Sequence, residues 1–236
     1  MRAIILAAGR GSRMRHLTDH GPKCLIKFKG KKLIDWQLDA LANAGISDIG
    51  IVTGYKRQSL SDLGLVEFYN ARWATTNMVS SLACANAWLF EGPCIVSYSD
   101  IFYATAAVTS LMKKKTPLAI TYDPNWLTIW SRRFENPLLD AETFSLHRDG
   151  TVSEIGKTPT TTEKIQGQYM GLIRFEPKGW SELARICKGL PLNEFDKMHM
   201  TWILQKIIEA GNVPIHAVPY NGEWGEVDSE GDLDAY

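Results

Sequence analysis

The sequence predicts an α/β protein whose central sheet is mixed but mostly parallel and is flanked by helices. Short, continuous apolar runs recur along the first half, as expected for strands buried on both faces. Stretches with helical periodicity separate these runs, and this alternation is typical of a parallel sheet with crossover helices. In the second half, 144–147 and 152–155 flank Asp149-Gly150, a pattern that indicates an antiparallel hairpin.

The first half, residues 1–122, alternates strands and helices in regular order. Strands are expected at 3–8, 48–53, 66–69, 94–98 and 117–122. Helices are expected at 33–44, 56–63, 77–90 and 105–114. Gly45 follows the first helical stretch and is its expected C-cap, because glycine ends helices readily.

The second half, residues 123–236, has a different pattern. Beyond the hairpin, strands are expected at 168–175, 213–219 and 224–227, and helices at 177–188 and 198–210. No linker, repeat or low-complexity segment divides the chain. We therefore expect a single domain over 1–236, with a nearly parallel first half and a mixed second half.

Composition excludes several classes of function. The 236 residues carry 26 basic and 26 acidic side chains, and this zero net charge argues against general nucleic-acid or membrane-surface binding. The four cysteines are widely spaced, which predicts reduced thiols in a cytoplasmic protein and no zinc site or disulfide framework. No apolar run approaches the ~20 residues of a membrane span, and no charged leader precedes the first strand, so neither an anchor nor a signal peptide is expected.

The first strand leads into a glycine loop, Gly9-Arg10-Gly11-Ser12-Arg13, and a second cation, Lys23, follows Pro22. Glycines let the backbone approach a ligand closely and offer its N–H groups to phosphate oxygens. The loop is not a P-loop, because no lysine directly follows its second glycine. The pattern indicates a cradle for a nucleoside triphosphate.

Leu6-Ala7-Ala8-Gly9-Arg10-Gly11-Ser12-Arg13-Met14 with Pro22-Lys23 resembles the signature of the sugar-phosphate-type nucleotidyltransferases. The resemblance implies a Rossmann-like, GT-A-type fold in which 1–122 binds the nucleotide and 123–236 binds the acceptor. It also implies a possible homodimer. By this resemblance, Ala8 and Gly9 meet the base and ribose, Gly11 and Arg13 the β- and γ-phosphates, and Lys23 the α-phosphate. Leu6, Ala7, Ser12 and Ser99 complete the same binding surface.

Asp100 follows the expected strand 94–98, and Asp228 follows the expected strand 224–227. Either one alone is equally well explained as a turn or helix cap. As a pair they match the two aspartates that hold Mg²⁺ in the resembled superfamily, so the resemblance implies a magnesium site at Asp100 and Asp228. Carboxylate and phosphate oxygens are the ligands that Mg²⁺ prefers. With Lys23 and Arg13, these aspartates are the expected catalytic residues.

The stretch Thr76-Asn77-Met78-Val79-Ser80-Ser81-Leu82 resembles the Asn-x-x-x-Ser-Leu element of small cytidylyltransferases for phosphocholine and phosphonates. The resemblance implies that Asn77 and Ser81 read the base of CTP; a capped helix start is the alternative. Thr76 departs from the family, which often has asparagine there. Tyr55, after Gly54, is expected to shape the base pocket or to pack in the core.

The acceptor pocket is expected around Trp126, Trp130, Arg132 and Arg133, where the family places it. Adjacent arginines favour an anionic acceptor, whereas tryptophans suit a quaternary ammonium; surface arginines and packed tryptophans are the alternative. Lys157 is expected near the acceptor phosphate or in a solvated turn. Asp140, Glu142 and Tyr169 are further candidates for the pocket wall. His20 and His199 match no triad or metal spacing.

These features predict a Mg²⁺-dependent cytidylyltransferase that couples CTP to a small phosphonate or phosphomonoester, such as 2-aminoethylphosphonate or phosphocholine, and releases pyrophosphate. One alternative is a sugar-1-phosphate nucleotidyltransferase that uses dTTP, UTP or GTP. A second is a non-catalytic, nucleotide-binding regulatory domain. No nucleic-acid or membrane partner is expected.

Overall fold

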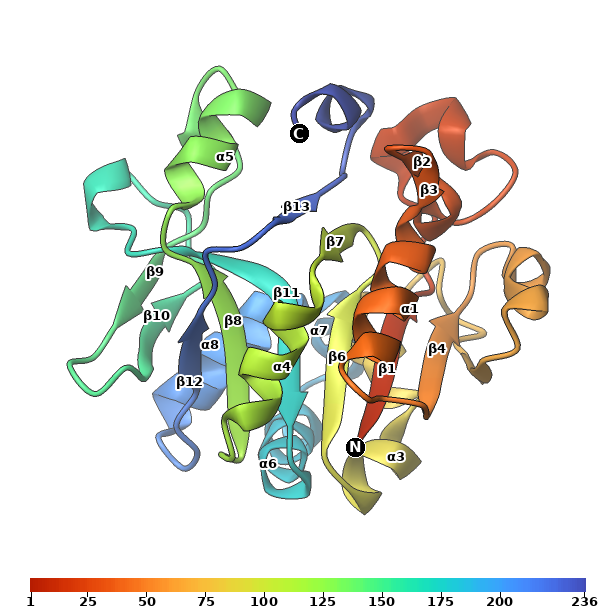
Figure 1. Cartoon of the computed structure of the whole chain (residues 1–236). Helices are drawn as coiled ribbons and strands as arrows, with labels where there is room; N and C mark the ends of the chain where they lie inside the picture. Colours follow the sequence, from red (N-terminus) through yellow and green to blue (C-terminus); the bar gives the residue numbers. More distant parts are fainter.

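The computed structural model describes residues 1–236 and is built around a seven-stranded sheet with the order β12-β8-β11-β6-β1-β4-β5 (Figure 1). All neighbouring strands are parallel except β11, which runs antiparallel to both β6 and β8. The predicted mixed, mostly parallel sheet is confirmed. The strands of this sheet are β1 (Arg2–Ala7), β4 (Ile49–Thr53), β5 (Val66–Tyr69), β6 (Cys94–Tyr98), β8 (Leu118–Asp123), β11 (Gln168–Phe175) and β12 (His216–Pro219).

Helices cover both faces of the sheet, as the continuous apolar runs of its strands require. Figure 1 shows α1 (Leu33–Asn43) and α4 (Thr105–Lys113) on one face. Behind the sheet lie α3 (Asn86–Glu91), α6 (Pro177–Lys188) and α8 (Met200–Ala210). Ile4 and Ile5 in β1 are completely buried, because β1 lies inside the sheet between β6 and β4.

Three short strand pairs stand outside the main sheet. They are β2 (Lys27–Phe28) with β3 (Lys31–Lys32), β9 (Phe144–Leu146) with β10 (Val152–Ile155), and β7 (Ile101–Tyr103) with β13 (Trp224–Glu226). The β9–β10 pair is the predicted hairpin. The β7–β13 pair joins the middle of the chain to its end and was not predicted, since its partners are about 120 residues apart and lack a shared local signal.

Several helices differ from the sequence prediction. The helix expected over 77–90 is two helices, α2 (Met78–Ala83) and α3, because Ala85 leaves helical geometry at φ −97° and ψ 20°. The expected helix over 56–63 is a 3₁₀-helix from Arg57 to Leu63. Two helices were missed, α5 (Trp126–Arg133) and α7 (Leu192–Lys197). The strand expected from 213 begins only at His216.

No helix combines the length and the apolar character needed to cross a membrane. All four cysteines are free thiols.

Candidate active site

The glycine loop follows β1 and bends sharply at Gly11, where φ is +70°. A Cβ atom at this position would lie 3.0 Å from the Cβ of Lys23, so a larger residue would combine backbone strain with a tight contact. Glycine therefore lets Lys23 pack directly against the loop. The 3₁₀-helix Ser12–Thr18 begins immediately afterwards and carries Arg13 in its first turn.

Gly54 and Tyr55 hold the loop from the neighbouring strand. A Cβ atom at Gly54 would lie 2.6 Å from the carbonyl oxygen of Ala8, which only glycine avoids. The backbone N–H of Tyr55 donates to that same oxygen at 2.9 Å, and its hydroxyl donates to the carbonyl of Thr18 at 2.9 Å. Tyr55 thus braces the loop from outside.

The β7–β13 pair brings Asp100 and Asp228 together. Glu226 pairs with Ile101, and the N–H of Val227 donates to the carbonyl oxygen of Asp100 at 2.8 Å. Asp100 precedes β7 and Asp228 follows β13, so the antiparallel pairing places both carboxylates at one point. Glu226 joins them, and one carboxylate oxygen from each of the three lies within 4.8 Å of the others.

Two cations reach this carboxylate cluster, defined as Asp100, Glu226 and Asp228. Lys23 Nζ lies 2.7 Å from Asp100 Oδ2 and also pairs with Asp228, while Arg13 lies 2.7 Å from Asp228 Oδ2. Burial alone would lower the pKa of Lys23, but the two aspartates outweigh it and raise that pKa above its ordinary value. Lys23 therefore keeps its charge.

Glu226 is the most perturbed acid of the cluster. Burial, followed by repulsion from Asp228 and Asp100, raises its pKa to about 8. A dense negative field of this kind is what a divalent cation relieves. Asp100 Oδ1 is moreover buried without a hydrogen-bond partner, so it is available as a ligand. The three carboxylates therefore fit a hard cation such as Mg²⁺, which prefers oxygen ligands.

A buried arginine supports the cluster from behind. The Arg133 side chain is fully buried; its Nε donates to Asp232 Oδ1 at 2.8 Å and its Nη1 to Glu226 Oε2 at 3.1 Å. Asp232 Oδ2 in turn accepts from the backbone N–H groups of Asp228 and Ser229, both at 2.8 Å. Arg133 thus connects Glu226 to the loop that carries Asp228.

Two cavities open on either side of the carboxylate cluster. The first, the glycine-loop cavity, has 13 lining residues: Leu6, Ala8, Gly9, Gly11, Arg13, Lys23, Trp73, Thr76, Asn77, Met78, Ser81, Ser99 and Asp100. Lys23 and Arg13 are the two cationic side chains that line this cavity. Asn77 caps α2 through its side-chain oxygen, which accepts from the N–H of Met78 at 2.8 Å.

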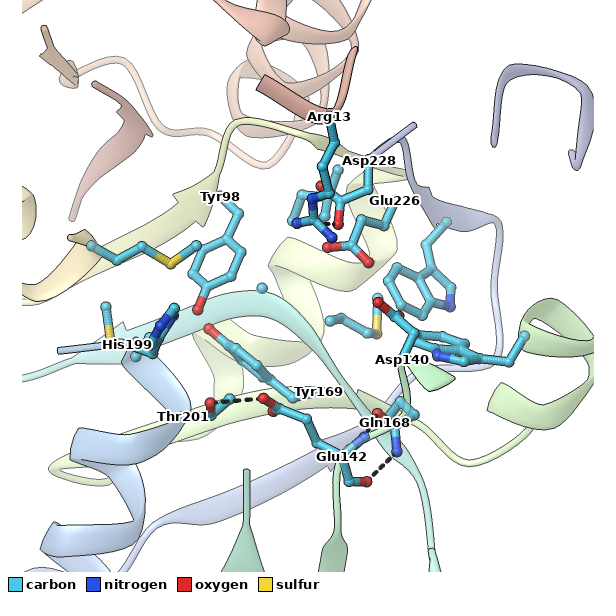
Figure 2. Close-up of a pocket in the computed structure, with 17 residues that line it drawn as sticks. Arg13, Tyr98, Asp140, Glu142, Gln168, Tyr169, His199, Thr201, Glu226 and Asp228 are labelled. Carbon is cyan, nitrogen blue, oxygen red and sulfur yellow. Dashed lines mark hydrogen bonds and ion pairs between the residues drawn. The ribbon is translucent and has the colours of Figure 1, made fainter. Parts of the chain in front are cut away.

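The second, the carboxylate cavity, lies between β6, β11, α8 and the end of the chain, and Figure 2 shows its side chains around a central space. Its 17 lining residues are Arg13, Met78, Tyr98, Ile101, Trp130, Asp140, Glu142, Gln168, Tyr169, Met170, Gly171, His199, Met200, Thr201, Trp224, Glu226 and Asp228. Four of these are acidic. Arg13 and Met78 line both cavities, so the two meet at the carboxylate cluster.

Comparison with known proteins agrees with this arrangement. The MobA-like NTP transferase domain matches residues 3–143, which is more than half of the chain. The chain belongs to this family. It is a nucleotidyltransferase, and its glycine loop, Lys23 and Asp100 all fall inside the matched region.

Individual relatives extend the likeness over the whole chain. The chain is 38% identical to a CTP:phosphoglutamine cytidylyltransferase of Campylobacter jejuni, over 99% of this chain and 98% of the relative. It is 26% identical to a 2-aminoethylphosphonate cytidylyltransferase of Lancefieldella rimae, over 99% and 91%. The solved structure of the CTP:phosphocholine cytidylyltransferase of Streptococcus pneumoniae has the same fold, with a TM-score of 0.73 at 22% identity over 99% and 96%.

The nucleotidyltransferase brings most of the predicted nucleotide-binding residues to one cavity. Leu6, Ala8, Gly9, Gly11, Arg13, Lys23, Asn77, Ser81 and Ser99 line the glycine-loop cavity. Ala7, Ser12 and Tyr55 do not line it. Ala7 is 1% exposed and packs in the core, and Tyr55 holds the loop as described. The two predicted metal ligands, Asp100 and Asp228, lie together in the carboxylate cluster. Asp100 lines the glycine-loop cavity and Asp228 lines the carboxylate cavity.

The predicted acceptor residues are divided. Trp130 and Tyr169 line the carboxylate cavity, but Arg132, Arg133 and Lys157 do not. Arg132 is exposed on α5, and Arg133 is engaged with Glu226 and Asp232. Lys157 lies on the surface and pairs with Glu154 at 2.7 Å.

Sequence reasoning missed some of the lining. Glu226 was not expected in the cluster, although it stands two residues before Asp228 in an extended segment, where alternate side chains share a face. Gln168 and His199 were not expected in the carboxylate cavity. His199 also contacts the Asn77 amide at 3.3 Å, but no local pattern in the sequence marks it.

Proposed function

We propose that this nucleotidyltransferase is a cytidylyltransferase that couples CTP to a small phosphonate or phosphomonoester, giving a CMP-activated product and pyrophosphate. 2-Aminoethylphosphonate, phosphocholine and phosphoglutamine are the acceptors to test first, because relatives that match this chain are named for them. The observation that carries the proposal is the meeting of two cavities at one carboxylate cluster, with Asp100 lining one and Asp228 the other. A transferase needs two substrates to meet at such a junction.

In the proposed reaction, an acceptor oxygen in the carboxylate cavity attacks the α-phosphorus of CTP, which lies in the glycine-loop cavity. The bond from the α-phosphorus to the bridging oxygen breaks, and pyrophosphate leaves. The attacking oxygen is already anionic, so no general base is required. Catalysis then rests on positioning and charge neutralisation.

Lys23 and Arg13 provide the neutralising charge. Both line the glycine-loop cavity beside Gly9 and Gly11, where a triphosphate would lie. Negative charge grows on the α-phosphoryl oxygens and on the leaving pyrophosphate during transfer, so fixed cations there stabilise the transition state more than the ground state. The backbone N–H groups of the loop add further donors.

Asp100 and Asp228, with Glu226, would hold the Mg²⁺ ion of the proposed reaction. A bound Mg²⁺ supplies charge neutralisation and orientation for the phosphate oxygens. Arg133 and Asp232 keep the carboxylates in place through the contacts described above.

We assign base recognition to the α2 end of the glycine-loop cavity. Asn70 Nδ2 donates to Ser81 Oγ at 3.0 Å and to Thr76 Oγ1 at 2.9 Å, which fixes both hydroxyls. Asn77 lies between them in the sequence and lines the same wall. Fixed hydroxyl and amide groups suit the hydrogen-bonding edge of cytosine.

A pyrophosphate-release assay tests the proposal. CTP, UTP, GTP, ATP and dTTP are each offered with 2-aminoethylphosphonate, phosphocholine, phosphoglutamine and a set of sugar 1-phosphates. We expect release with CTP and at least one of the first three acceptors. Release with dTTP and a sugar 1-phosphate, with none from CTP, would overturn the assignment. Binding of nucleotides without release from any pair would favour a regulatory domain.

A further inference from the structure

A buried glutamine in α1 lies directly behind the turn that carries Asp100. Gln37 is fully buried, on the face of α1 that also packs Ile34 and Leu41 into the core. An amphipathic helix normally has an apolar residue at such a position, because burying an amide is costly unless its hydrogen bonds to water are replaced. The glutamine therefore indicates a specific polar role at this place in the core.

The amide of Gln37 holds the turn at both of its ends. Nε2 donates to the carbonyl oxygen of Tyr98 at 3.0 Å and to that of Ile101 at 2.5 Å. An amide nitrogen carries two protons, so these two bonds use both of them. Oε1 has no partner, so the two donors are what the buried amide contributes. Ser99 and Asp100 lie between the two carbonyls, and the end of β6 is thereby fixed relative to the start of β7.

Two hydroxyl groups extend this buried network. Ser97 Oγ donates to the same Tyr98 carbonyl oxygen at 2.9 Å and accepts from the Tyr103 hydroxyl at 3.0 Å. Ser97 and Tyr103 are both buried. Every donor in the network has an acceptor, which favours a single conformation of the turn.

The network holds the turn through backbone carbonyls and leaves the Asp100 carboxylate free for other partners. Asp100 Oδ2 pairs with Lys23 at 2.7 Å, while Oδ1 is buried and has no hydrogen-bond partner. A side-chain hydrogen bond to Asp100 would compete with a cation for these oxygens, whereas a bond to the backbone does not. Gln37 thus fixes where the carboxylate lies without using any of its capacity as a ligand.

The other two acids of the carboxylate cluster depend on the same turn. β13 is placed by its pairing with β7, in which Glu226 lies opposite Ile101. The N–H of Val227 donates to the Asp100 carbonyl oxygen, and the Gln37 amide is bonded to Ile101 itself. A shift of this turn would therefore change the distances among all three carboxylates.

On the basis of the proposed function and its metal ion, we propose that Gln37 is a positioning residue for that metal. Its amide fixes the turn 98–101, so that the carboxylate cluster keeps a geometry suited to a divalent cation. Gln37 lines neither cavity, so its replacement acts on the metal through the Asp100 turn and not through a contact with either substrate. Replacing residues that orient metal ligands typically weakens metal binding by about 10- to 100-fold.

Titration of the substrate-free protein with Mn²⁺, with free Mn²⁺ followed by electron paramagnetic resonance, tests this inference. Gln37→Met removes the two donors and keeps an unbranched side chain of similar size. We expect its dissociation constant for Mn²⁺ to rise about tenfold or more. Gln37→Asn keeps an amide on a shorter side chain that does not reach both carbonyls, and it should weaken Mn²⁺ binding less. Asp100→Asn shows how much of the binding belongs to the carboxylate cluster.

Gln205→Met is the matched control. Gln205 is 9% exposed in α8, and its amide also bonds to the backbone, since Oε1 accepts from the N–H of Ile155 at 3.0 Å. Gln205 lines neither cavity. Both methionine variants should melt below the wild type, but only Gln37→Met should lose affinity for Mn²⁺. A role in stability alone would not separate the two variants in this way.

Wild-type affinity for Mn²⁺ in Gln37→Met, or in Gln37→Asn where the methionine variant does not fold, would overturn the inference. An equal loss of affinity in Gln205→Met would also overturn it, and neither result would contradict the cytidylyltransferase. If the wild type binds Mn²⁺ no better than Asp100→Asn does, the inference and the proposed metal site both fail. If Mn²⁺ binds as expected but no pair of substrates releases pyrophosphate, the positioning role stands and the proposed function fails.

Discussion

The glycine-loop cavity and the carboxylate cavity share a wall but are assembled in different ways. The first takes all its lining from three short segments, namely Leu6 to Lys23, Trp73 to Ser81 and Ser99-Asp100. The second collects side chains from segments spread between Arg13 and Asp228, and its longest run is the four residues Gln168 to Gly171 of β11. A site formed by backbone and neighbouring residues leaves a motif in the sequence, whereas a site formed by scattered side chains does not.

The two cavities also differ in charge. Lys23 and Arg13 face the first, where phosphates would carry the negative charge, while four acids face the second. The carboxylate cluster lies at their boundary and is balanced by Lys23, Arg13 and Arg133. The following variants test whether the two cavities bind different substrates.

The largest effect is expected from Lys23→Met, which removes one of the two cations of the glycine-loop cavity and keeps an unbranched side chain of similar size. We expect kcat/KM for CTP to fall about a thousandfold, the order seen when one transition-state donor is lost. Thermal melting checks that the variant is folded. A rise in the KM for the acceptor with kcat/KM for CTP unchanged would contradict the placement of Lys23 in the glycine-loop cavity. Lys115→Met, at the opposite end of the sheet after α4, is the control.

The next largest effect is expected from Arg133→Met, which leaves Asp232 and Glu226 without their buried partner. Removing one member of a buried ion pair costs about 3 kcal/mol or more, so we expect the melting temperature to fall by about 10 °C. Arg133→Lys should not restore stability fully, because lysine lacks the rigid guanidinium fork whose Nε reaches Asp232 while its Nη1 reaches Glu226. The neighbouring Arg132→Met, on the exposed side of α5, should melt like the wild type.

The sequence could predict those parts of the site that depend on local conformation. The glycine loop, Lys23, Asp100 and Asp228 each follow a strand or a proline within a few residues, and the resemblance to the nucleotidyltransferase signature then singles them out. The sequence could also have predicted which way the Arg133 side chain points. Trp126, Trp130 and Arg133 recur at helical spacing, and this places Arg133 on the inward face of α5 while Arg132 points outward. The signal was present, but α5 was not recognised as a helix.

Other parts of the site had no local signal. The meeting of Asp100 with Glu226 depends on β7 and β13, which pair across more than 120 residues and are three residues long each. The break between α2 and α3 at Ala85 falls in a run without glycine or proline, so no helix-breaking residue marks it. Gln168 and His199 reach the carboxylate cavity only because β11 and α8 pack beside it.

A smaller, pH-dependent effect should separate the two cavities. Burial raises the pKa of Glu142, so this acid is protonated at a higher pH than an exposed carboxylate. The ionised form attracts the ammonium of 2-aminoethylphosphonate and the neutral form does not, so the KM for this acceptor should rise as the pH falls from 7.5 to 5.5. The KM for CTP should rise less. Glu142→Gln should weaken the pH dependence for the acceptor, and an unaltered profile in that variant would show that another group is titrating.

The smallest effect is expected from Lys157→Ala. The Lys157 side chain is 55% exposed, pairs with Glu154 on the surface and lines neither cavity. Exposed ion pairs contribute little, because water and salt screen them, so kcat/KM for the acceptor should change by less than about twofold. A selective rise in the acceptor KM would mean that the acceptor extends past Glu142 and Thr201 to the end of β10. The carboxylate cavity would then be one part of a longer groove, and Glu142 would lie beside the middle of the acceptor rather than beside its end.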